Sequence, residues 1–313
     1  MIYIHKDVIY PDLKYHNYIK RILDRKRISN KVVDVHDMDL VKSLDVKDED
    51  ILIAMFKHDK EDLVKTKKVF PILSKKFKTM YPSPESYYYY DDKLKQYEFM
   101  VENDIPCLET HYVTCKEDIE KLNINFPIVT KKTWGAGAEQ INYFETLDSV
   151  VDDETTRSWT QDSIYPCLVQ EYEDTDCDLR LSICGDKVFY YKRMHLWKTG
   201  NKDNFPYGMP KTPRERVLKF REPPFKPPNQ KNIDEEEIYN LHDLIVKLHD
   251  LQKTKLNTYY MSWDIVNGKV LEFSVTATLN HPHHYYDINK KKTIKPSNNV
   301  FGTLEYLVNE YIK

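Results

Sequence analysis

The stretch that decides the fold is FPIVTKKTWGAGA, residues 126–138. Its first five residues form an apolar run typical of a β-strand, and Lys131 follows directly. Gly135 and Gly137 then stand one residue apart, although the chain has only seven glycines. Backbone N–H groups of such a loop can cradle phosphates, and the lysine upstream can neutralise them. The Walker spacing GxxxxGK[ST] is absent, so taken alone the stretch predicts either another kind of phosphate loop or a plain turn.

Elements on both sides of this loop carry further polar groups. A helix is predicted over 92–103, with Lys93 at its start and Ile105-Pro106 after its end. Taken alone, Lys93 is typical of solvated surface. Residues 167–172, CLVQEY, predict a strand whose backbone and terminal carboxylates suit an adenine edge and ribose hydroxyls. The alternative for that segment is an ordinary edge strand.

A hairpin is predicted over residues 178–192 around Gly185-Asp186. Asp178 and Arg180 have the same parity on a strand and so share a face, and Arg193 follows the second strand. Two arginines near phosphates would stabilise transferred charge. The alternative is a surface ion pair, which contributes little.

A second hairpin, 262–274, turns at Asn267-Gly268 and carries Asp264 and Glu272. Paired carboxylates on neighbouring strands are suited to Mg²⁺. A plain two-residue turn would place Asp264 opposite residue 271 and Glu272 on the other face. We therefore expect an odd loop or a bulge permitted by positive φ at Gly268, with Ser274 on the same face as Glu272.

The rest of the chain predicts a mainly α/β protein. Residues 1–90 alternate apolar strands with helices, which predicts a parallel sheet. The tyrosines at 87–90 are expected to face solvent or line a groove. A core-packing helix is predicted from Asp234, and a last helix over 303–312. The proline-rich residues 198–233 predict a long loop that serves as a lid or binding loop.

Composition excludes several classes of protein. In 313 residues, 41% are hydrophobic and 31% charged, which allows a core, and the net charge of −3 gives no reason to expect nucleic-acid binding. No apolar run is long enough to span a membrane, and no secretory signal is visible at the start. Five cysteines without a CxxC motif predict reduced thiols in the cytoplasm.

The order of these features resembles the ATP-grasp superfamily, and above all the ligases that add glutamate to a ribosomal protein and their glutathione-synthetase-like relatives. The resemblance covers residues 91–313. It implies an α/β protein with an ATP-grasp fold, in which an N-terminal parallel-sheet unit precedes two α+β lobes that clasp ATP. The expected domains are the N-terminal unit over 1–90, the small lobe with the glycine loop over 91–170, and the large lobe with the metal site over 171–313.

The resemblance also implies a role for each matching residue. The implied contacts are as follows: Lys93 and Lys131 with ATP phosphates, Gly135 and Gly137 in the mobile loop over the nucleotide, Gln170, Glu171 and Tyr172 with adenine, Glu173 with ribose, Asp178, Arg180 and Arg193 with the transferred group, and Asp264 and Glu272 with metal. The implied cofactors are ATP and Mg²⁺, with Mn²⁺ as a substitute.

This sequence departs from the family pattern in three places. Ser274 stands where the family usually has asparagine, so we expect a water between its hydroxyl and the metal. Lys132 stands where an apolar residue is usual. Residues 204–208 replace an arginine-glycine segment, which implies a changed acceptor site with Asn204 as a candidate phosphate or metal contact. The histidines at 281, 283 and 284 are expected to be solvated surface; the alternatives are contact with the acceptor and, after that, a metal site.

The activity implied by the resemblance is an ADP-forming carboxylate–amine ligase that works through an acyl phosphate. The acid would belong to a small molecule, a peptide or a glycan, and would be joined to an amine. The alternatives are an ATP-binding module without ligase activity, an ATP-grasp kinase and a peptide macrocycle-forming ligase. The sequence leaves the substrates and the oligomeric state open.

Overall fold

The N-terminal unit is a parallel sheet with helices, as its alternating pattern predicts. The computed structural model describes residues 1–6, 14–56, 60–134, 141–150, 164–175, 177–194, 235–275, 285–294 and 303–313. Strands β1 (Ile2–His5), β2 (Asn30–Val33), β3 (Ile51–Ile53) and β4 (Thr79–Tyr81) pair in the order β2-β1-β3-β4, all parallel. They are followed in turn by α1 (Tyr15–Arg25), α2 (Met38–Ser43), α3 (Lys60–Lys76) and α4 (Pro84–Tyr87).

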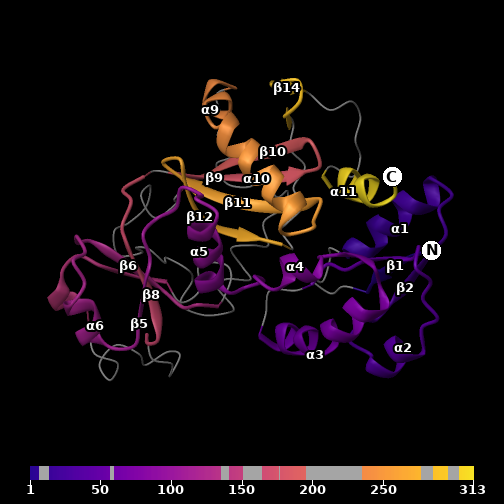
Figure 1. The fold of residues 1–313 in the computed structure, drawn as a ribbon, viewed down its shortest axis with the longest axis horizontal. Helices are drawn as coiled ribbons and strands as arrows, with labels where there is room; N and C mark the ends of the chain where they lie inside the picture. Colours follow the sequence, from indigo (N-terminus) through magenta and orange to yellow (C-terminus); the bar gives the residue numbers. More distant parts are fainter. Residues whose placement is uncertain are drawn as a thin grey trace, which may run out of the picture.

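A small antiparallel sheet forms the opposite end of the molecule (Figure 1). It consists of β5 (His111–Val113), β6 (Ile128–Lys131), β7 (Ile141–Phe144) and β8 (Cys167–Glu171), in the order β5-β8-β6-β7. Helix α6 (Lys116–Glu120) and the short 3₁₀ helix η1 (Leu147–Ser149) belong to the same segment. Its apolar core, which includes Val113, Ile128 and Val169, is separate from the other two core clusters of the described residues.

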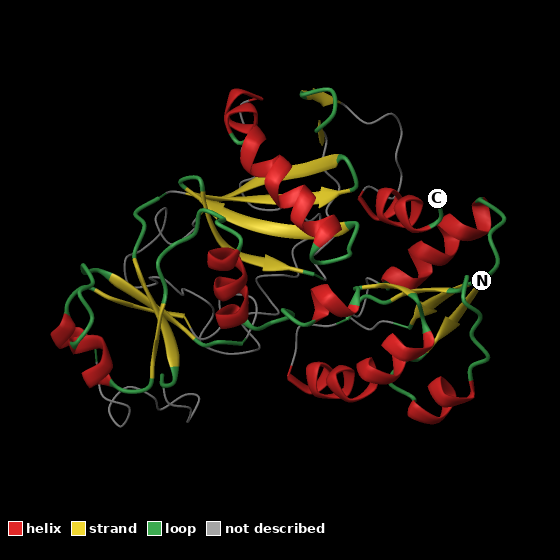
Figure 2. Cartoon of the chain, viewed as in Figure 1, coloured by secondary structure: helices red, strands yellow, loops and turns green. Residues whose placement is uncertain are grey.

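The large sheet is also antiparallel and lies between the two ends. Its strands are β9 (Cys177–Cys184), β10 (Lys187–Met194), β11 (Tyr260–Val266), β12 (Lys269–Ser274), β13 (Tyr285–Asp287) and β14 (Lys292–Ile294), in the order β12-β11-β9-β10-β13-β14. Helices α9 (Glu235–Asn240) and α10 (His242–Thr254) lie across one of its faces (Figure 2). That face is apolar and carries Leu181 and Trp263, which are fully buried. None of the helices in the described ranges is both long and apolar enough to span a lipid bilayer.

Two helices pack outside the lobe that their place in the sequence suggests. Helix α5 (Lys93–Glu102) precedes the small sheet in the sequence, yet its Phe99 ring packs against Phe273 of β12, in the large sheet, with ring centroids 5.7 Å apart. Helix α11 (Thr303–Tyr311) closes the chain against the N-terminal unit, where Glu305 pairs with Arg25 of α1 at 2.8 Å. The N-terminal unit and the large sheet therefore share two apolar core clusters, each with residues from both parts.

Two local expectations need correction. The helix predicted from Asp234 is interrupted at Leu241 and forms α9 and α10, although Ile238, Ile245 and Leu248 are fully buried as expected. The tyrosine run is also not uniformly exposed. Tyr87, the last residue of α4, and Tyr90, in the turn after it, are buried in one apolar core cluster and stacked with ring centroids 5.1 Å apart. The expected loop at 198–233 lies outside the described residues.

Candidate active site

The hairpin β11–β12 places Asp264 and Glu272 opposite each other on one sheet face. The register runs Val266↔Lys269 and Ile265↔Val270, and then shifts to Asp264↔Glu272, so Leu271 is one extra residue on β12. The predicted bulge is therefore confirmed, but its position differs from the prediction. Asn267 and Gly268 form a two-residue turn with φ of 48° and 77°, so positive φ serves the turn, and the bulge comes three residues later at Leu271.

The next strand adds Arg180 to the same face. Arg180 lies opposite Asp264, and its Nε and Nη2 donate to the two carboxylate oxygens at 2.7 Å each. The side chains are only 16% and 4% exposed. Burial alone would lower the pKa of Arg180, but the Asp264 carboxylate outweighs burial and the pKa lies well above its ordinary value. The ion pair thus gives the site a fixed charged centre.

Two lysines approach the acids from other elements. The N–H of Lys93, the first residue of α5, donates to the carbonyl of Thr133 at 2.7 Å, which ties the helix to the end of β6. The Lys93 ammonium lies 3.8 Å from Glu272 Oε2. Burial lowers the pKa of Lys131 on β6, whereas Glu272 raises it and Lys93 lowers it again. Lys93 therefore contacts Glu272 directly, and the charges of Glu272 and Asp264 both act on Lys131.

A residue that the sequence did not single out holds this arrangement in place. Gln96 is buried in α5, one turn after Lys93. Its Oε1 accepts from the backbone N–H of Phe273 at 3.1 Å, and its Nε2 donates to the carbonyl of Tyr89 at 3.0 Å. Helix α5 is thereby fixed to β12 beside Glu272. A single polar residue on a helix is usually surface, so only its position three residues after Lys93 could have drawn attention to it.

The side chains predicted to contact adenine and ribose are engaged by the protein itself. Gln170 is buried and donates to Thr110 Oγ1 at 2.7 Å, while Glu171 accepts from the backbone and side chain of Asn125. The Tyr172 ring packs edge-on against Tyr143. These contacts hold the strand, which pairs with β5 on one side and with β6 on the other. The adenine role of Gln170, Glu171 and Tyr172 stays a prediction.

Glu173 binds the turn of the β11–β12 hairpin. Its carboxylate accepts from Lys269 Nζ at 2.7 Å and from Asn267 Nδ2 at 3.0 Å. The hydrogen bond from Lys269, with that from Asn267, lowers the pKa of Glu173. A ribose hydroxyl would have to compete with these two donors, so its ribose role stays a prediction.

The remaining predicted residues fall into two groups. Asp178 lies two residues from Arg180 on the same face, and Ser274 lies opposite Ser262 on the face of Glu272, as the period of two predicts. The backbone of Arg193 lies opposite Asp178 in β10. The side chain of Arg193 lies outside the described part of the structure, as do the loop with Gly135 and Gly137, Asn204, and residues 281–284.

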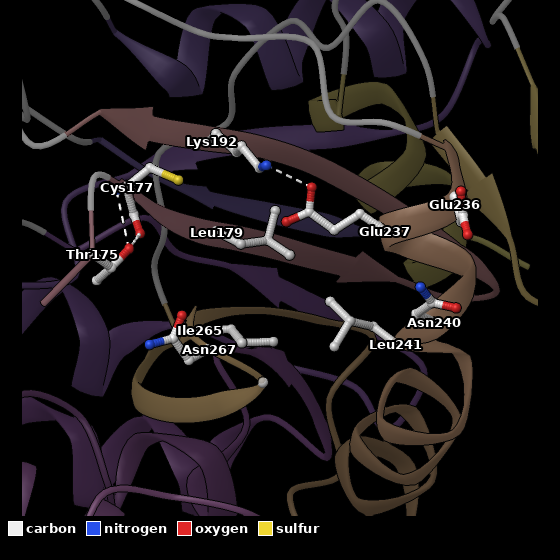
Figure 3. Close-up of a pocket in the computed structure, with 11 residues that line it drawn as sticks. Thr175, Cys177, Leu179, Lys192, Glu236, Glu237, Asn240, Leu241, Ile265 and Asn267 are labelled. Carbon is white, nitrogen blue, oxygen red and sulfur yellow. Dashed lines mark hydrogen bonds and ion pairs between the residues drawn. The ribbon is translucent and has the colours of Figure 1, made fainter. Parts of the chain in front are cut away.

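A separate cavity of about 480 Å³ lies on the other face of the large sheet. Thr175, Leu179, Lys192 and Glu237 are among its lining residues, and Figure 3 shows Lys192 and Glu237 pointing toward each other across it. Leu179 is the residue before Arg180 on β9, and Lys192 lies opposite Leu179 on β10. Because adjacent residues of a strand point to opposite faces, both face away from Asp264. Among the described residues, none of those predicted for the active site lines this cavity.

No protein-family model matches the sequence, and no curated protein matches it either. Solved structures do match the fold. The ATP-grasp ligase PsnB, solved with a minimal precursor, gives a TM-score of 0.57 at 12% identity, over 100% of this chain and 98% of that one.

Two further structures cover most of both chains. N5-carboxyaminoimidazole ribonucleotide synthetase from Thermotoga maritima gives a TM-score of 0.53 at 14% identity, over 99% of this chain and 75% of that one. D-alanine–D-alanine ligase from Bacillus anthracis, solved with ATP, gives a TM-score of 0.51 at 12% identity, over 89% of this chain and 86% of that one. At these identities the likeness concerns the fold, and the α/β architecture with its three sheets agrees with it. The chain has the fold of the ATP-grasp superfamily.

Proposed function

We propose that the protein is an ATP-dependent ligase that joins a carboxylate to an amine through an acyl phosphate, with release of ADP and phosphate. The observation that carries the proposal is the convergence of charges on one sheet face. Lys93 of α5 lies 3.8 Å from Glu272, and the charges of Glu272 and Asp264 act on Lys131 of β6. Glu272 lies opposite Asp264, which pairs with Arg180.

The acidic pair fits a magnesium ion that is bound together with phosphates. Among the described residues, no three His, Cys, Asp or Glu side chains gather in a way that could hold a metal alone. Mg²⁺ typically takes one or two protein carboxylates and completes its shell with substrate phosphates and water. Asp264 and Glu272 are two such carboxylates on one sheet face, and Ser274 follows Glu272 by two residues on β12. When bound, Mg²⁺ would neutralise charge on the phosphates during transfer.

The protein groups would act by position and charge. Lys93 and Lys131 would hold the phosphates of ATP, and Arg180 would stabilise the charge of the moving phosphoryl group. A carboxylate oxygen of the acid attacks the γ-phosphorus and the bond to the ADP oxygen breaks. The amine then attacks the acyl carbon, phosphate departs with the bonding electrons, and the amine loses a proton.

The solved structures with this fold support the proposal. They include a ligase in complex with ADP, Mg and a variant of its precursor, a ribonucleotide synthetase and a D-alanine–D-alanine ligase. We therefore propose that this protein also acts on the carboxylate of a small molecule, a peptide or a glycan. All five cysteines are free thiols, which agrees with a cytoplasmic enzyme.

One observation favours the alternative of an ATP-binding module without ligase activity. Arg180 occupies both oxygens of Asp264, and Ser274 replaces the amide that the family resemblance leads one to expect. In such a module Asp264 would remain paired with Arg180 after nucleotide binding. The ligase would require one oxygen of Asp264 to become available to metal.

The test is ADP release measured across a panel of carboxylates and amines, with mass spectrometry of the products. A ligase releases ADP only when both an acid and an amine are present, and a new amide mass appears. A kinase releases ADP with a single acceptor and no amine. A module that binds an ATP analogue in calorimetry but releases no ADP with any pair would contradict the proposal.

A further inference from the structure

The cavity on the other face of the large sheet has a charged end and an apolar end. Lys192 lies opposite Leu179, and Leu179 lies opposite Ile265, so the three side chains form a row across β10, β9 and β11. All three line the cavity, with Leu179 between the other two (Figure 3). Because neighbouring strands lie about 4.8 Å apart, the row spans roughly 10 Å. A ligand along this row meets an ammonium at one end and hydrocarbon at the other.

Helix α9 supplies the opposite wall of the cavity. Glu237 and Asn240 are three residues apart, which places them on one side of the helix, and Leu241 follows directly where α9 ends. Glu237 pairs with Lys192. Leu241 packs with Leu179 in the same apolar core cluster. This wall therefore also offers polar groups beside Lys192 and an apolar side chain beyond them.

The charged end of the cavity can hold groups of both signs. Among the described residues, the charged side chains that line it are Lys192, Glu236 and Glu237. The side chains of Lys192 and Glu237 are 22% and 39% exposed. An ion pair at such exposure contributes little, so a ligand can separate the two groups at small cost. A carboxylate of the ligand would then suit the Lys192 ammonium, and an ammonium of the ligand would suit the Glu237 carboxylate.

The volume of the cavity suits a small organic molecule. About 480 Å³ falls within the range of roughly 300–1,000 Å³ that is typical of small-molecule sites. Such sites have mostly apolar walls and a few polar groups that orient the ligand. An α-amino acid with an apolar side chain matches this cavity, because its carboxylate and ammonium are neighbours at one end and its body is hydrocarbon.

We infer that the cavity binds a free α-amino acid with an apolar side chain. Its carboxylate pairs with Lys192, its ammonium pairs with Glu237, and its side chain lies over Leu179 and Ile265. The row faces away from Asp264, because Ile265 and Asp264 are adjacent on β11. Binding of the amino acid here is therefore separate from the candidate active site and does not depend on the proposed ligase activity.

The first experiment uses the wild-type chain and three probes. L-Phenylalanine carries both charges, 2-phenylethylamine lacks the carboxylate, and 3-phenylpropionate lacks the ammonium. Isothermal titration calorimetry should show saturable binding of one phenylalanine per chain. Each analogue should bind about tenfold more weakly, which is the effect of losing one contact between charged groups. Phenylalanine should bind equally well with and without AMPPNP and Mg²⁺, since the nucleotide is expected on the other face.

Variants then locate the site. Lys192→Met should weaken phenylalanine and 3-phenylpropionate about tenfold and should not weaken 2-phenylethylamine. Glu237→Gln should weaken phenylalanine and 2-phenylethylamine and should not weaken 3-phenylpropionate. Glu272→Gln is the matched control, because Glu272 is also 39% exposed and lies near a lysine, but on the opposite face. It should bind all three probes as the wild type does.

Several results would overturn the amino-acid site. These are no saturable binding of phenylalanine to the wild type, or analogues that bind as tightly as phenylalanine. Phenylalanine binding that is lost in Glu272→Gln and kept in both cavity variants would place the amino acid at the active site and would also overturn it. The comparison of the three probes needs only the wild-type chain, so it decides the matter even where a variant fails to fold.

Discussion

Replacing Glu272 with glutamine should have opposite effects on nucleotide binding without and with Mg²⁺. The Glu272 carboxylate lies 3.8 Å from the Lys93 ammonium, and 39% of its side chain is exposed. Without metal, the Glu272 carboxylate pairs with the Lys93 ammonium and repels the incoming phosphates. At such exposure its charge should weaken the free energy of nucleotide binding by about 1 kcal/mol. Glu272→Gln should therefore tighten binding of metal-free AMPPNP by about fivefold.

With Mg²⁺ the sign should reverse. Glu272 is one of two carboxylates proposed to hold the metal, and the loss of a charged contact costs about 1.5–3 kcal/mol. Binding of AMPPNP with Mg²⁺ should therefore weaken by roughly 10- to 100-fold. Isothermal titration calorimetry in EDTA and then in Mg²⁺ measures both effects on the same protein.

Glu237→Gln is the matched control. Glu237 is also 39% exposed and pairs with a lysine, Lys192, but it lies by the cavity on the opposite sheet face. This variant should change neither affinity. Thermal unfolding should show both variants within about 1 kcal/mol of wild type, since exposed ion pairs contribute little. Weaker metal-free binding in Glu272→Gln, or equal changes in the two variants, would refute the reasoning.

Three further predictions follow from other contacts. Lys93→Met and Lys131→Met should each weaken ATP binding by about 1.5–3 kcal/mol in calorimetry, whereas Lys95→Met, on the exposed side of α5, should not. Burial lowers the pKa of His5 to about 3, below its ordinary value of 6.5, so the unfolded chain binds the extra proton first. Stability should therefore fall by up to about 1.4 kcal/mol per pH unit below pH 6.5, and urea unfolding of His5→Gln should lack this contribution. Gln96→Leu leaves a β12 backbone N–H unpaired and should cost about 1–3 kcal/mol in urea unfolding; an unchanged midpoint would count against its positioning role.

Much of the local structure could be predicted because its causes are local. The hairpin turns at Gly185-Asp186 and Asn267-Gly268 were expected from turn chemistry, and both contain residues at positive φ in the structure. The bulge between Asp264 and Glu272 followed from parity once both acids were expected to bind one metal, since residues 264 and 272 cannot share a face across a plain two-residue turn at 267–268. Its position at Leu271 was not predicted, because one extra residue anywhere between the two acids satisfies the parity argument.

The same local patterns did not predict several elements and contacts that depend on segments far apart in the sequence. Helix α3 and the pairing of β13 with β10 were not predicted, because short strands and mixed helices have weak periodicity. The burial of Tyr87 and Tyr90 was also missed, because both rings pack into a core that is built from segments distant in the sequence.

The sequence by itself determined the order of the site's parts along the chain: a lysine on a helix, a lysine before a glycine loop, a strand, and two hairpins with acids and arginine. Only the tertiary structure decided which of them meet. Arg180 and Asp264 are 84 residues apart, and their ion pair exists because β11 pairs with β9 in one register. Gln96 and Phe273 are 177 residues apart, and their hydrogen bond fixes α5, with Lys93, beside Glu272. Periodicity and turn chemistry act over a few residues, whereas these contacts arise when separate sheets and helices bury their apolar faces together.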